Sequence, residues 1–438
     1  MSREITTTAQ MHFKQALLAQ PQARVVQRSV MNNGINATSE DSNVQSQLAR
    51  TFSLELPTGK VSNQKHSGRC WLFSTLNTLR HEVAVKYKLK DFEFSENYLS
   101  FWDRFEKANA FYENIIATAD QAADSRMVTW LLEGPNGDGG QWDNAAALIK
   151  KYGLVPKSVM PETQASENTT EFNQVLNLRL RKDAVALRQL VADGASAADL
   201  AAAKEKMLTV IYRICAYAFG TPVEHFDFSY RDDDKKYHRI NDLTPQSFAA
   251  SYLSRDLDDY ITVINSPDKP FNQLYTLPME DNVLGGQHVT FLNVDLATFK
   301  SLTIAQLKAG ETIWFGNDVL EQMSRTKGLL DSHLFNYDQL FDTDLQLSKK
   351  ERLQYKQAAV SHAMTFTGVD LVDNQPTKWK VENSWGEKVG ADGYFVMSDQ
   401  WFDDYVYHVV INHKFLSADL QQILQSKPTE LTPWDSMA

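Results

Sequence analysis

Of the two cysteines in this 438-residue chain, Cys70 stands where a thiol could act as a nucleophile. A catalytic thiol must ionise near neutral pH, whereas a free cysteine has a pKa of about 8.5. The unpaired N–H groups in the first turn of a helix favour an anion and lower that pKa. Cys70 follows Ser67-Gly68-Arg69 and opens a segment with a helical apolar period, so we expect it to begin a helix. A lone cysteine is more often a buried structural residue, and Cys215 inside Ile211–Tyr217 fits that role.

Three further polar residues could complete an acyl-transfer site around Cys70. The amide of Gln64 and the backbone N–H of Cys70 could donate together to an oxyanion. His362 could accept the thiol proton as a general base. The side-chain oxygen of Asn383 could accept the ring N–H of His362 and hold the ring in orientation. Together these residue types predict attack of a thiolate on a carbonyl carbon.

The elements that must position these residues can be traced in the sequence. Apolar residues of the segment 63–88 recur every three or four positions, which predicts a helix with one buried face. Residues 362–369 and 378–383 alternate in polarity, and Asp373-Asn374-Gln375-Pro376 forms a turn between them. These patterns predict a β-hairpin that brings His362 beside Asn383. An isolated histidine would more often be structural, but this pairing favours catalysis.

Helical patterns occupy the first part of the chain and strand patterns the last third, which favours an α+β protein over alternating βαβ units. Residues 166–220 form long Ala- and Leu-rich helices that Gly194 interrupts, and Ser196 with Asp199 forms a capping box. We expect five segments, and their ranges are an N-terminal helical segment (1–58), a helical lobe with the nucleophile (59–165), a helical insertion (166–260), a β-rich lobe with His362 and Asn383 (261–414) and a C-terminal arm (415–438).

Composition excludes several classes of protein. Hydrophobic content of 43% and aromatic content of 11% allow a large core and argue against a disordered or fibrous chain. A formal net charge of −11 argues against a nucleic-acid partner, because phosphate neutralisation needs a basic surface. No apolar stretch has the length of a signal peptide or a membrane span, so we expect a cytoplasmic protein whose reducing surroundings keep Cys70 as a thiol. No His-Glu-x-x-His motif occurs, so we expect neither a metal nor another cofactor.

Several motifs resemble the bleomycin hydrolase and aminopeptidase C branch of the papain-like cysteine peptidases. They are Asn63-Gln64-Lys65, Gly68-Arg69-Cys70-Trp71, Ser361-His362-Ala363-Met364 and Glu382-Asn383-Ser384-Trp385-Gly386. The likeness continues through Asp138–Asp143, Lys151–Lys157, Trp314-Phe315-Gly316 and Pro433-Trp434-Asp435, so it spans nearly the whole chain. It implies a papain-like two-lobed fold, a helical lobe and a β-rich lobe, with a large helical insertion. The insertion accounts for a Cys-to-His separation about twice the 130–150 residues of ordinary papain-type enzymes.

The resemblance also assigns roles to residues. It gives Gln64, Cys70, His362 and Asn383 the roles argued above for oligopeptide substrates. It implies that Gly139 and Gly140 let the substrate backbone approach closely, and that Trp385 shields the Asn–His contact from water. It implies an arm that reaches the substrate cleft at Ala438, and a homohexamer whose sites face an internal channel. No cofactor, nucleic acid or membrane is implied.

Two positions depart from the pattern of this branch. Asn317 stands where relatives commonly have a cysteine, and the chain stops at Ala438, about three residues short of the relatives. In the aminopeptidases of this branch the terminal carboxylate of the arm faces the free amino group of the substrate, which makes them exopeptidases. The three residues that this arm lacks would span roughly 10 Å in extended form. Their absence leaves space for about two or three more substrate residues upstream of the cleaved bond. We therefore expect an oligopeptide endopeptidase, with removal of N-terminal residues as the alternative.

Two other functions stay open at this point. The same thiolate could hydrolyse an amide that is not a peptide, because substrate choice depends on the shape of the pocket. A non-catalytic nucleic-acid-binding or scaffold protein could also use this fold, but such a protein would have no need of Cys70, His362 and Asn383 together.

Overall fold

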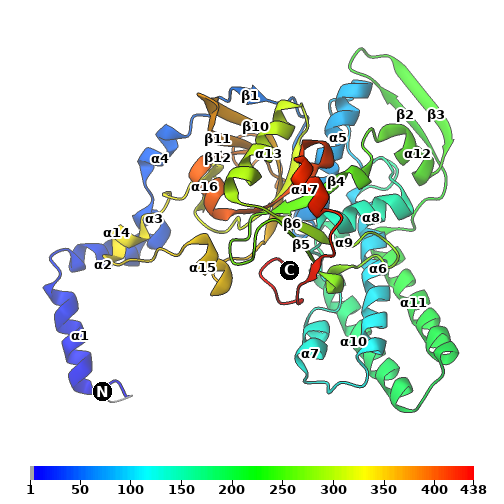
Figure 1. Ribbon diagram of the computed structural model, residues 1–438, viewed down its shortest axis with the longest axis horizontal. Helices are drawn as coiled ribbons and strands as arrows, with labels where there is room; N and C mark the ends of the chain where they lie inside the picture. Colours follow the sequence, from blue (N-terminus) through cyan, green and yellow to red (C-terminus); the bar gives the residue numbers. More distant parts are fainter. Residues whose placement is uncertain (1–3) are drawn as a thin grey trace.

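The fold has a helical part and a sheet part, which meet along helix α5 (Cys70–Tyr87) (Figure 1). The computed structural model describes residues 4–438. Each part has a large apolar core of its own, and Trp314 of the sheet part donates through Nε1 to the carbonyl of Trp71 on α5, at 3.0 Å. The mixed α+β class expected from the sequence is confirmed.

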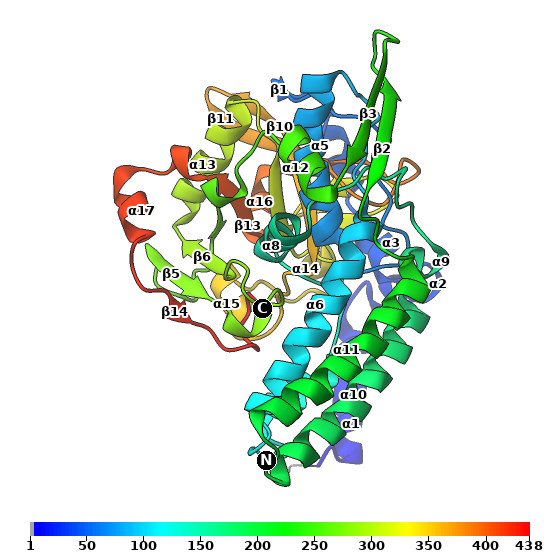
Figure 2. The same cartoon turned by 90° about the vertical axis from the view of Figure 1, so that its right-hand side faces the viewer.

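The helical part contains long rods that pack side by side (Figure 2). Its helices are α5 (Cys70–Tyr87), α6 (Glu96–Ala117), α7 (Arg126–Glu133), α8 (Trp142–Tyr152), α9 (Gln164–Glu167), α10 (Thr170–Ala192), α11 (Ala197–Phe219) and α12 (Pro245–Tyr252). The break between α10 and α11 lies at Gly194, which has a φ of 76° that a glycine adopts without strain. The predicted capping box of Ser196 and Asp199 is present at the start of α11.

Helix α5 begins at Cys70, as the sequence predicts, and the part of the segment 63–88 before Cys70 is not helical. Residues 63–69 form a loop, because Asn63 bridges to Trp385 in the sheet part and the Gln64 N–H donates to the carbonyl of Ser384 at 2.8 Å. These backbone bonds to a distant segment replace the helical ones. The helix therefore starts at Cys70, and the thiol occupies its first turn.

The sheet part is built on one large sheet. Its strands are β1 (Leu54–Glu55), β4 (Tyr260–Ile264), β5 (Gln273–Thr276), β6 (Thr290–Asn293), β7 (Ile313–Asn317), β8 (Met323–Ser324), β9 (Leu329–Leu330), β10 (His362–Val372), β11 (Gln375–Glu382), β12 (Tyr394–Ser398), β13 (Val406–Asn412) and β14 (Thr429–Glu430). Their order is β14-β5-β6-β4-β13-β7-β10-β11-β12-β9-β8, with β1 paired to β10. The helices of this part are α13 (Leu296–Lys308), α14 (Tyr337–Phe341), α15 (Lys349–Gln354), α16 (Asp399–Tyr405) and α17 (Ala418–Ile423).

The predicted hairpin is present as β10 and β11. The two strands pair antiparallel, and the register places Thr365 opposite Glu382. Asp373 and Asn374 connect them with φ values of 51° and 64°, which suits a tight two-residue turn. The turn is shorter than predicted, because Gln375 already belongs to β11.

The segment 166–260 is not helical throughout, although the sequence predicts a helical insertion there. After α11 it forms a two-stranded hairpin of β2 (Phe226–Arg231) and β3 (Tyr237–Leu243), which projects from the body (Figure 2). The acidic run Asp232–Asp234 lies in the turn, where Asp232 Oδ2 and His238 Nε2 are 2.8 Å apart. The chain returns to helix at α12 and to the main sheet at β4.

The first residues form an extended helical arm. Helices α1 (Thr7–Ala19), α2 (Ala23–Asn33), α3 (Ile35–Ser39) and α4 (Ser42–Gln47) lead from the exposed end of the arm to the sheet part (Figure 1). Helix α1 has no buried residue, and neither has α2. Within residues 4–438, no helix has both the length and the apolar character needed to cross a bilayer.

Candidate active site

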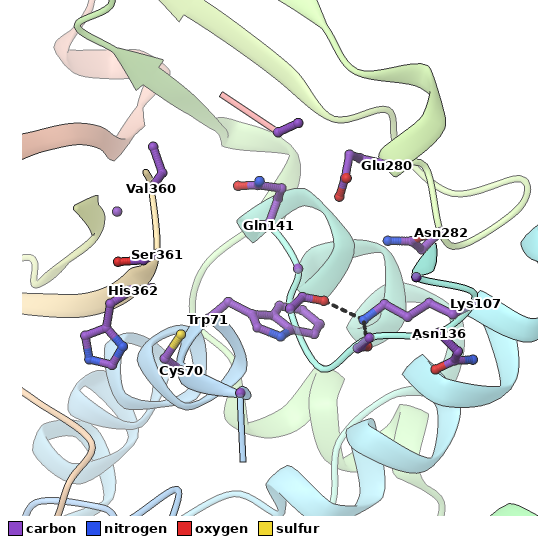
Figure 3. Close-up of a pocket in the computed structure, with 18 of the residues that line it drawn as sticks. Cys70, Trp71, Lys107, Asn136, Gln141, Glu280, Asn282, Val360, Ser361 and His362 are labelled. Atoms are coloured by element: carbon purple, nitrogen blue, oxygen red, sulfur yellow. Dashed lines mark hydrogen bonds between the residues drawn. The ribbon is translucent and has the colours of Figure 1, made fainter. Parts of the chain in front are cut away.

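Cys70 lies where the helical part meets the sheet part. Its neighbours Trp71 and Leu72 are buried in the helical core, which fixes the first turn of α5. Asp138 anchors the preceding loop, because its Oδ2 accepts from the Gly68 N–H at 2.7 Å and its carbonyl accepts from Trp71 Nε1 at 2.7 Å. Figure 3 shows the sulfur of Cys70 beside the imidazole of His362.

The hairpin brings His362 and Asn383 together, as predicted. His362 is the first residue of β10, and Asn383 directly follows β11. His362 Nε2 lies 2.9 Å from Asn383 Oδ1. Asn383 Oδ1 also accepts from the Ser384 N–H at 2.7 Å, which identifies this atom as the acceptor oxygen. The Nε2–H of His362 therefore donates to Asn383, and Nδ1 is left to exchange a proton with Cys70.

Trp385 covers the contact between His362 and Asn383. The ring centroids of His362 and Trp385 are 4.8 Å apart, and the guanidinium of Arg325 lies 4.4 Å from the centroid of the Trp385 ring. Burial lowers the pKa of His362 to about 4; Asn383 opposes this shift, and the positive charge of Arg325 adds to it. The ring therefore stays neutral down to low pH while the thiol is protonated.

Burial also disfavours the charged form of Cys70, and for a thiol this means a raised pKa. The backbone N–H groups of Ala363, Trp71 and Cys70 itself oppose this shift, since they donate toward the sulfur. Burial thus disfavours a charge on either group alone. When the proton passes from Cys70 to His362, both charges appear together, and opposite charges 4 Å apart attract by about 4 kcal/mol at an effective dielectric constant of 20. The arrangement therefore favours a thiolate–imidazolium pair over either single charge.

Both polar atoms of the Gln64 side-chain amide are hydrogen-bonded. Its Oε1 accepts from Ser384 Oγ at 2.6 Å, and its Nε2 donates to the Ser67 carbonyl at 2.7 Å. An amide nitrogen carries two hydrogens, so one N–H of Gln64 remains for a ligand. The Cys70 N–H, at the first position of α5, has no carbonyl partner within its helix. These two donors can serve an oxyanion formed at a carbonyl that the thiolate attacks.

A cavity of ≈ 340 Å³ extends from Cys70 and His362 between the two parts of the fold. It is lined by Gly68, Cys70, Trp71, Lys107, Trp130, Gly134, Pro135, Asn136, Gly137, Gly139, Gly140, Gln141, Met279, Glu280, Asn282, Trp314, Gly316, Val360, Ser361, His362, Ala363 and Ala438. The cavity thus joins the candidate nucleophile to the glycine-rich loop Gly134–Gly140 and to the last residue of the C-terminal arm. Its size is that of a small ligand pocket.

The two glycines predicted to face substrate differ in their surroundings. A Cβ on Gly140 would lie 2.7 Å from the Trp71 indole, so this position requires glycine for packing. A Cβ on Gly139 would meet no atom within 4 Å. Lys107 of α6 supports the loop, because its Nζ donates to the carbonyls of Gly137 at 3.1 Å and Gly139 at 2.5 Å (Figure 3). Of the two glycines, Gly139 is therefore the one with open space beside it, and the role predicted for the pair stays a prediction.

The C-terminal arm lies against the sheet part and reaches the cavity. Strand β14 pairs parallel with β5, and Met437 is buried in an apolar cluster. Lys269 Nζ lies 2.9 Å from Asp435 Oδ1, and the Ala438 N–H donates to the Asp435 carbonyl at 3.3 Å. The expectation that the arm approaches the cleft at Ala438 agrees with this geometry.

Sequence reasoning assigned no role to four residues that shape the site. Lys107 resembles many other helix cations, and Glu280 and Ser384 stand in loop sequence with no periodic signal. Asp138, inside Gly134–Gly140, could have been recognised, because an acidic residue between glycines often binds backbone N–H groups. Cys215 is buried, as predicted, and burial raises its pKa to about 12.

Comparison with known proteins agrees with this geometry. The model of the Peptidase C1-like family matches residues 4–438. Aminopeptidase C of Lactobacillus delbrueckii subsp. lactis is 47% identical over 442 residues, which cover 100% of this chain and 98% of that relative. Aminopeptidase E of Lactobacillus helveticus is 47% identical over 439 residues and is covered in full, as is this chain. The crystal structure of PepW from Lactobacillus rhamnosis HN001 superposes with a TM-score of 0.99 at 57% identity, covering 100% of this chain and 99% of that one. The chain belongs to the Peptidase C1-like family and is a papain-like cysteine peptidase of the bleomycin hydrolase and aminopeptidase C branch.

Proposed function

We propose that this thiol peptidase removes residues from the amino end of oligopeptides, with Cys70, His362 and Asn383 as its catalytic group. The observation that carries the catalytic assignment is the 2.9 Å contact between His362 Nε2 and Asn383 Oδ1, next to a cysteine in the first turn of a helix. This is the arrangement that nucleophile, base and orienting group require.

In the first half of the reaction, Cys70 transfers its proton to Nδ1 of His362 and its sulfur attacks the peptide carbonyl. The oxygen of that carbonyl gains a negative charge, which the free N–H of Gln64 and the Cys70 N–H stabilise. His362 then gives its proton to the nitrogen of the leaving peptide, the C–N bond breaks, and a thioester remains on Cys70.

In the second half, water attacks the thioester. His362 accepts a proton from that water, and the same two donors hold the oxyanion. Collapse of the intermediate breaks the C–S bond, releases the acid and returns the proton to Cys70. Asn383 keeps a proton on Nε2 of His362 throughout, because its oxygen can only accept from Nε2, and Nδ1 is the atom that gains and loses a proton.

Two features support cutting near the amino end. Aminopeptidases C and E are among the relatives that resemble this chain over its full length. Ala438, the last residue of the C-terminal arm, belongs to the lining of the cavity. A bound peptide must share the cavity with this residue, which limits how far the peptide can extend on the amino side of the cleaved bond. The names of the relatives thus favour the alternative of the sequence analysis over the endopeptidase it preferred.

The test compares one octapeptide with a free amino end and its N-acetyl form, with products followed over time by mass spectrometry. We expect shortening from the amino end for the free peptide and little hydrolysis of the blocked one. The Cys70→Ala variant, prepared identically, controls for contaminating peptidases. Internal cleavage of both peptides at equal rates would instead establish the endopeptidase, which the open volume of ≈ 340 Å³ beside Cys70 can accommodate.

We also propose that the chain forms a homohexamer and works in the cytoplasm. Helix α1 exposes apolar side chains that a monomer would leave in water, namely Met11, Phe13, Leu17 and Leu18. Helices α10 and α11 likewise expose Leu178, Val185 and Tyr217. Apolar surface of this kind is characteristic of contacts between subunits. Light scattering on the full chain measures its mass in solution, and a monomer at micromolar concentration would contradict the proposal.

A further inference from the structure

Glu280 occupies the wall of the cavity that faces the glycine-rich loop. It ends a short 3₁₀ turn, Pro278–Glu280, in the connection between β5 and β6. Figure 3 shows its carboxylate directed into the space above the indole of Trp71, with Gln141 and Asn282 on either side. The residue thus belongs to the sheet part, while the glycine-rich loop opposite belongs to the helical part.

The backbone around Glu280 is fixed relative to the glycine-rich loop. Asn144, in the first turn of α8, donates through Nδ2 to the Glu280 carbonyl at 2.8 Å. Its Oδ1 accepts from the Gln141 N–H at 2.9 Å, so the side chain of Asn144 is hydrogen-bonded to both walls of the cavity, at Gln141 and at Glu280. On the far side of the turn, Asp281 Oδ1 accepts from the Val289 N–H at 2.8 Å. Glu280 therefore extends from a rigid support.

The carboxylate of Glu280 has no hydrogen-bond or ion-pair partner among residues 4–438. The nearby cation, Lys107, is already engaged, since its Nζ donates to Asp103 Oδ2 at 2.8 Å and to the carbonyls of Gly137 and Gly139. Burial raises the pKa of Glu280; Lys107 opposes that shift and Asp281 adds to it. A half-buried carboxylate without a partner is costly, and a cation supplied by a ligand would satisfy it.

The chemistry of the reaction tells which part of a peptide reaches Glu280. The leaving nitrogen must receive its proton from His362, so the departing peptide lies on the side of His362 and Trp385. His362 lines the cavity where it meets Cys70, but Trp385 does not, whereas Gly139 and Glu280 do. The cavity therefore holds the acyl part of the substrate, which is the part on the amino side of the cleaved bond.

We propose that Glu280 is a specificity-determining residue whose carboxylate binds a protonated nitrogen on the amino side of the cleaved bond, first of all the free α-ammonium of the substrate. A charge-assisted hydrogen bond of this kind gives both affinity and position. The assignment deepens the proposed function, on which it rests, by naming the group that recognises the amino end. The same chemistry would also accept the side chain of a lysine or arginine in that part of the peptide.

The test uses Glu280→Gln, which keeps the shape of the side chain and removes its charge. Three peptides of one length serve as substrates: one with a free amino end and neutral side chains, its N-acetyl form, and an N-acetyl form with lysine next to the residue that acylates Cys70. We expect kcat/KM for the free peptide to fall roughly 10- to 100-fold, as for the loss of a hydrogen bond to a charged group. The neutral blocked peptide should change by less than about 3-fold.

Asp281→Asn is the matched control. It removes the same charge one residue away, where the side chain faces His288 at 2.7 Å and not the cavity, and asparagine keeps an oxygen that can accept from the Val289 N–H. It should leave the ratio between free and blocked peptides unchanged. A change in that ratio as large as for Glu280→Gln would mean that general electrostatics, and not a contact of Glu280, selects the substrate, and would overturn the proposal.

The outcomes separate this proposal from the proposed function. A wild-type preference for the free amino end that persists in Glu280→Gln would overturn the role of Glu280 and leave the aminopeptidase intact. If the wild type cuts free and neutral blocked peptides alike, the aminopeptidase fails. Glu280 then stands only if the lysine peptide is preferred by the wild type and loses that preference in Glu280→Gln, which identifies the side chain as the cation. No charge-dependent difference in any peptide would overturn it.

Discussion

Replacing Gln64 by alanine should slow peptide hydrolysis by roughly 10²–10³-fold in kcat, equivalent to about 2.7–4 kcal/mol of transition-state stabilisation. The magnitude follows from counting donors. One N–H of Gln64 is taken by the Ser67 carbonyl at 2.7 Å, so the side chain offers a single hydrogen to the oxyanion. The Cys70 N–H remains as the second donor in the variant. The loss expected is therefore that of one donor from a pair.

The assay pairs two reactions of the same thiol. Peptide hydrolysis passes through an oxyanion, whereas alkylation by iodoacetamide displaces iodide from a saturated carbon and forms none. Gln64→Ala should lose kcat on peptides and retain the alkylation rate of Cys70 within about 3-fold. Ser384→Ala is the matched control for Gln64→Ala. It removes the hydrogen bond to Oε1 of Gln64 and leaves the amide itself in place. Loss of one such hydrogen bond, about 0.5–1.5 kcal/mol, predicts a drop of roughly 2- to 10-fold.

One result would refute this reasoning. If alkylation slows as much as hydrolysis, Gln64 acts by shaping the thiol or the loop before α5, and the oxyanion assignment is wrong. Thermal unfolding of each variant, compared with the wild type, shows whether the loop has lost its structure. An unchanged midpoint together with a selective loss of hydrolysis supports the assignment.

Four further predictions concern the thiol, its base and the indole that covers the base. Iodoacetamide should modify Cys70 far faster than Cys215, whose pKa burial raises to about 12, and peptidase activity should fall in proportion to modified Cys70 as measured by peptide mapping. His362→Ala should lower kcat by roughly 10²–10⁴-fold and Asn383→Ala by less, because the second change misorients the base without removing it; equal losses in steady-state assays would indicate a collapsed site. Since burial lowers the pKa of His362 to about 4, kcat/KM should persist at pH 5–6 and fall as pH drops through about 4. Trp385→Ala should hydrate the ring, raise its pKa toward the usual range and move this acidic limb to higher pH; an unmoved limb would contradict the shielding role.

The sequence predicts those elements whose signals are local. The alternation of residues 362–369 and the turn at Asp373-Asn374 are sufficient for the β10–β11 hairpin, because its strands are adjacent in the chain. A hairpin of this kind brings its two ends together whatever surrounds it. The contact of His362 with Asn383 can therefore be predicted from the sequence alone. The helix of Cys70 is predictable for the same reason, from its apolar period.

Other features depend on partners far away in the sequence and could not be predicted. The course of the loop before α5 depends on backbone bonds from residues 63 and 64 to Ser384 and Trp385. Glu280 lies in a loop whose course is set by Asn144 of α8, more than a hundred residues earlier. In both cases a tertiary contact, and not a local preference, decides the geometry. The β2–β3 hairpin differs, because Phe226, Phe228 and Tyr230 alternate with polar residues in β2; this local strand pattern was missed inside a segment interpreted as helical.

The short stretch from Glu382 to Trp385 explains how one strand end can assemble a site from both parts of the fold. Glu382 makes a buried ion pair at 2.6 Å with Arg80 of α5, the helix that begins with the nucleophile. Asn383 accepts from the imidazole of His362, the proposed base, Ser384 Oγ donates to the amide of Gln64 at 2.6 Å, and Trp385 packs against the imidazole. Four consecutive residues thus set the positions of the helix and of the proposed base, oxyanion donor and shield. Because neighbouring residues on one strand end cannot shift independently, a displacement of this end would disturb every step of the reaction together, which is the condition for a preorganised site.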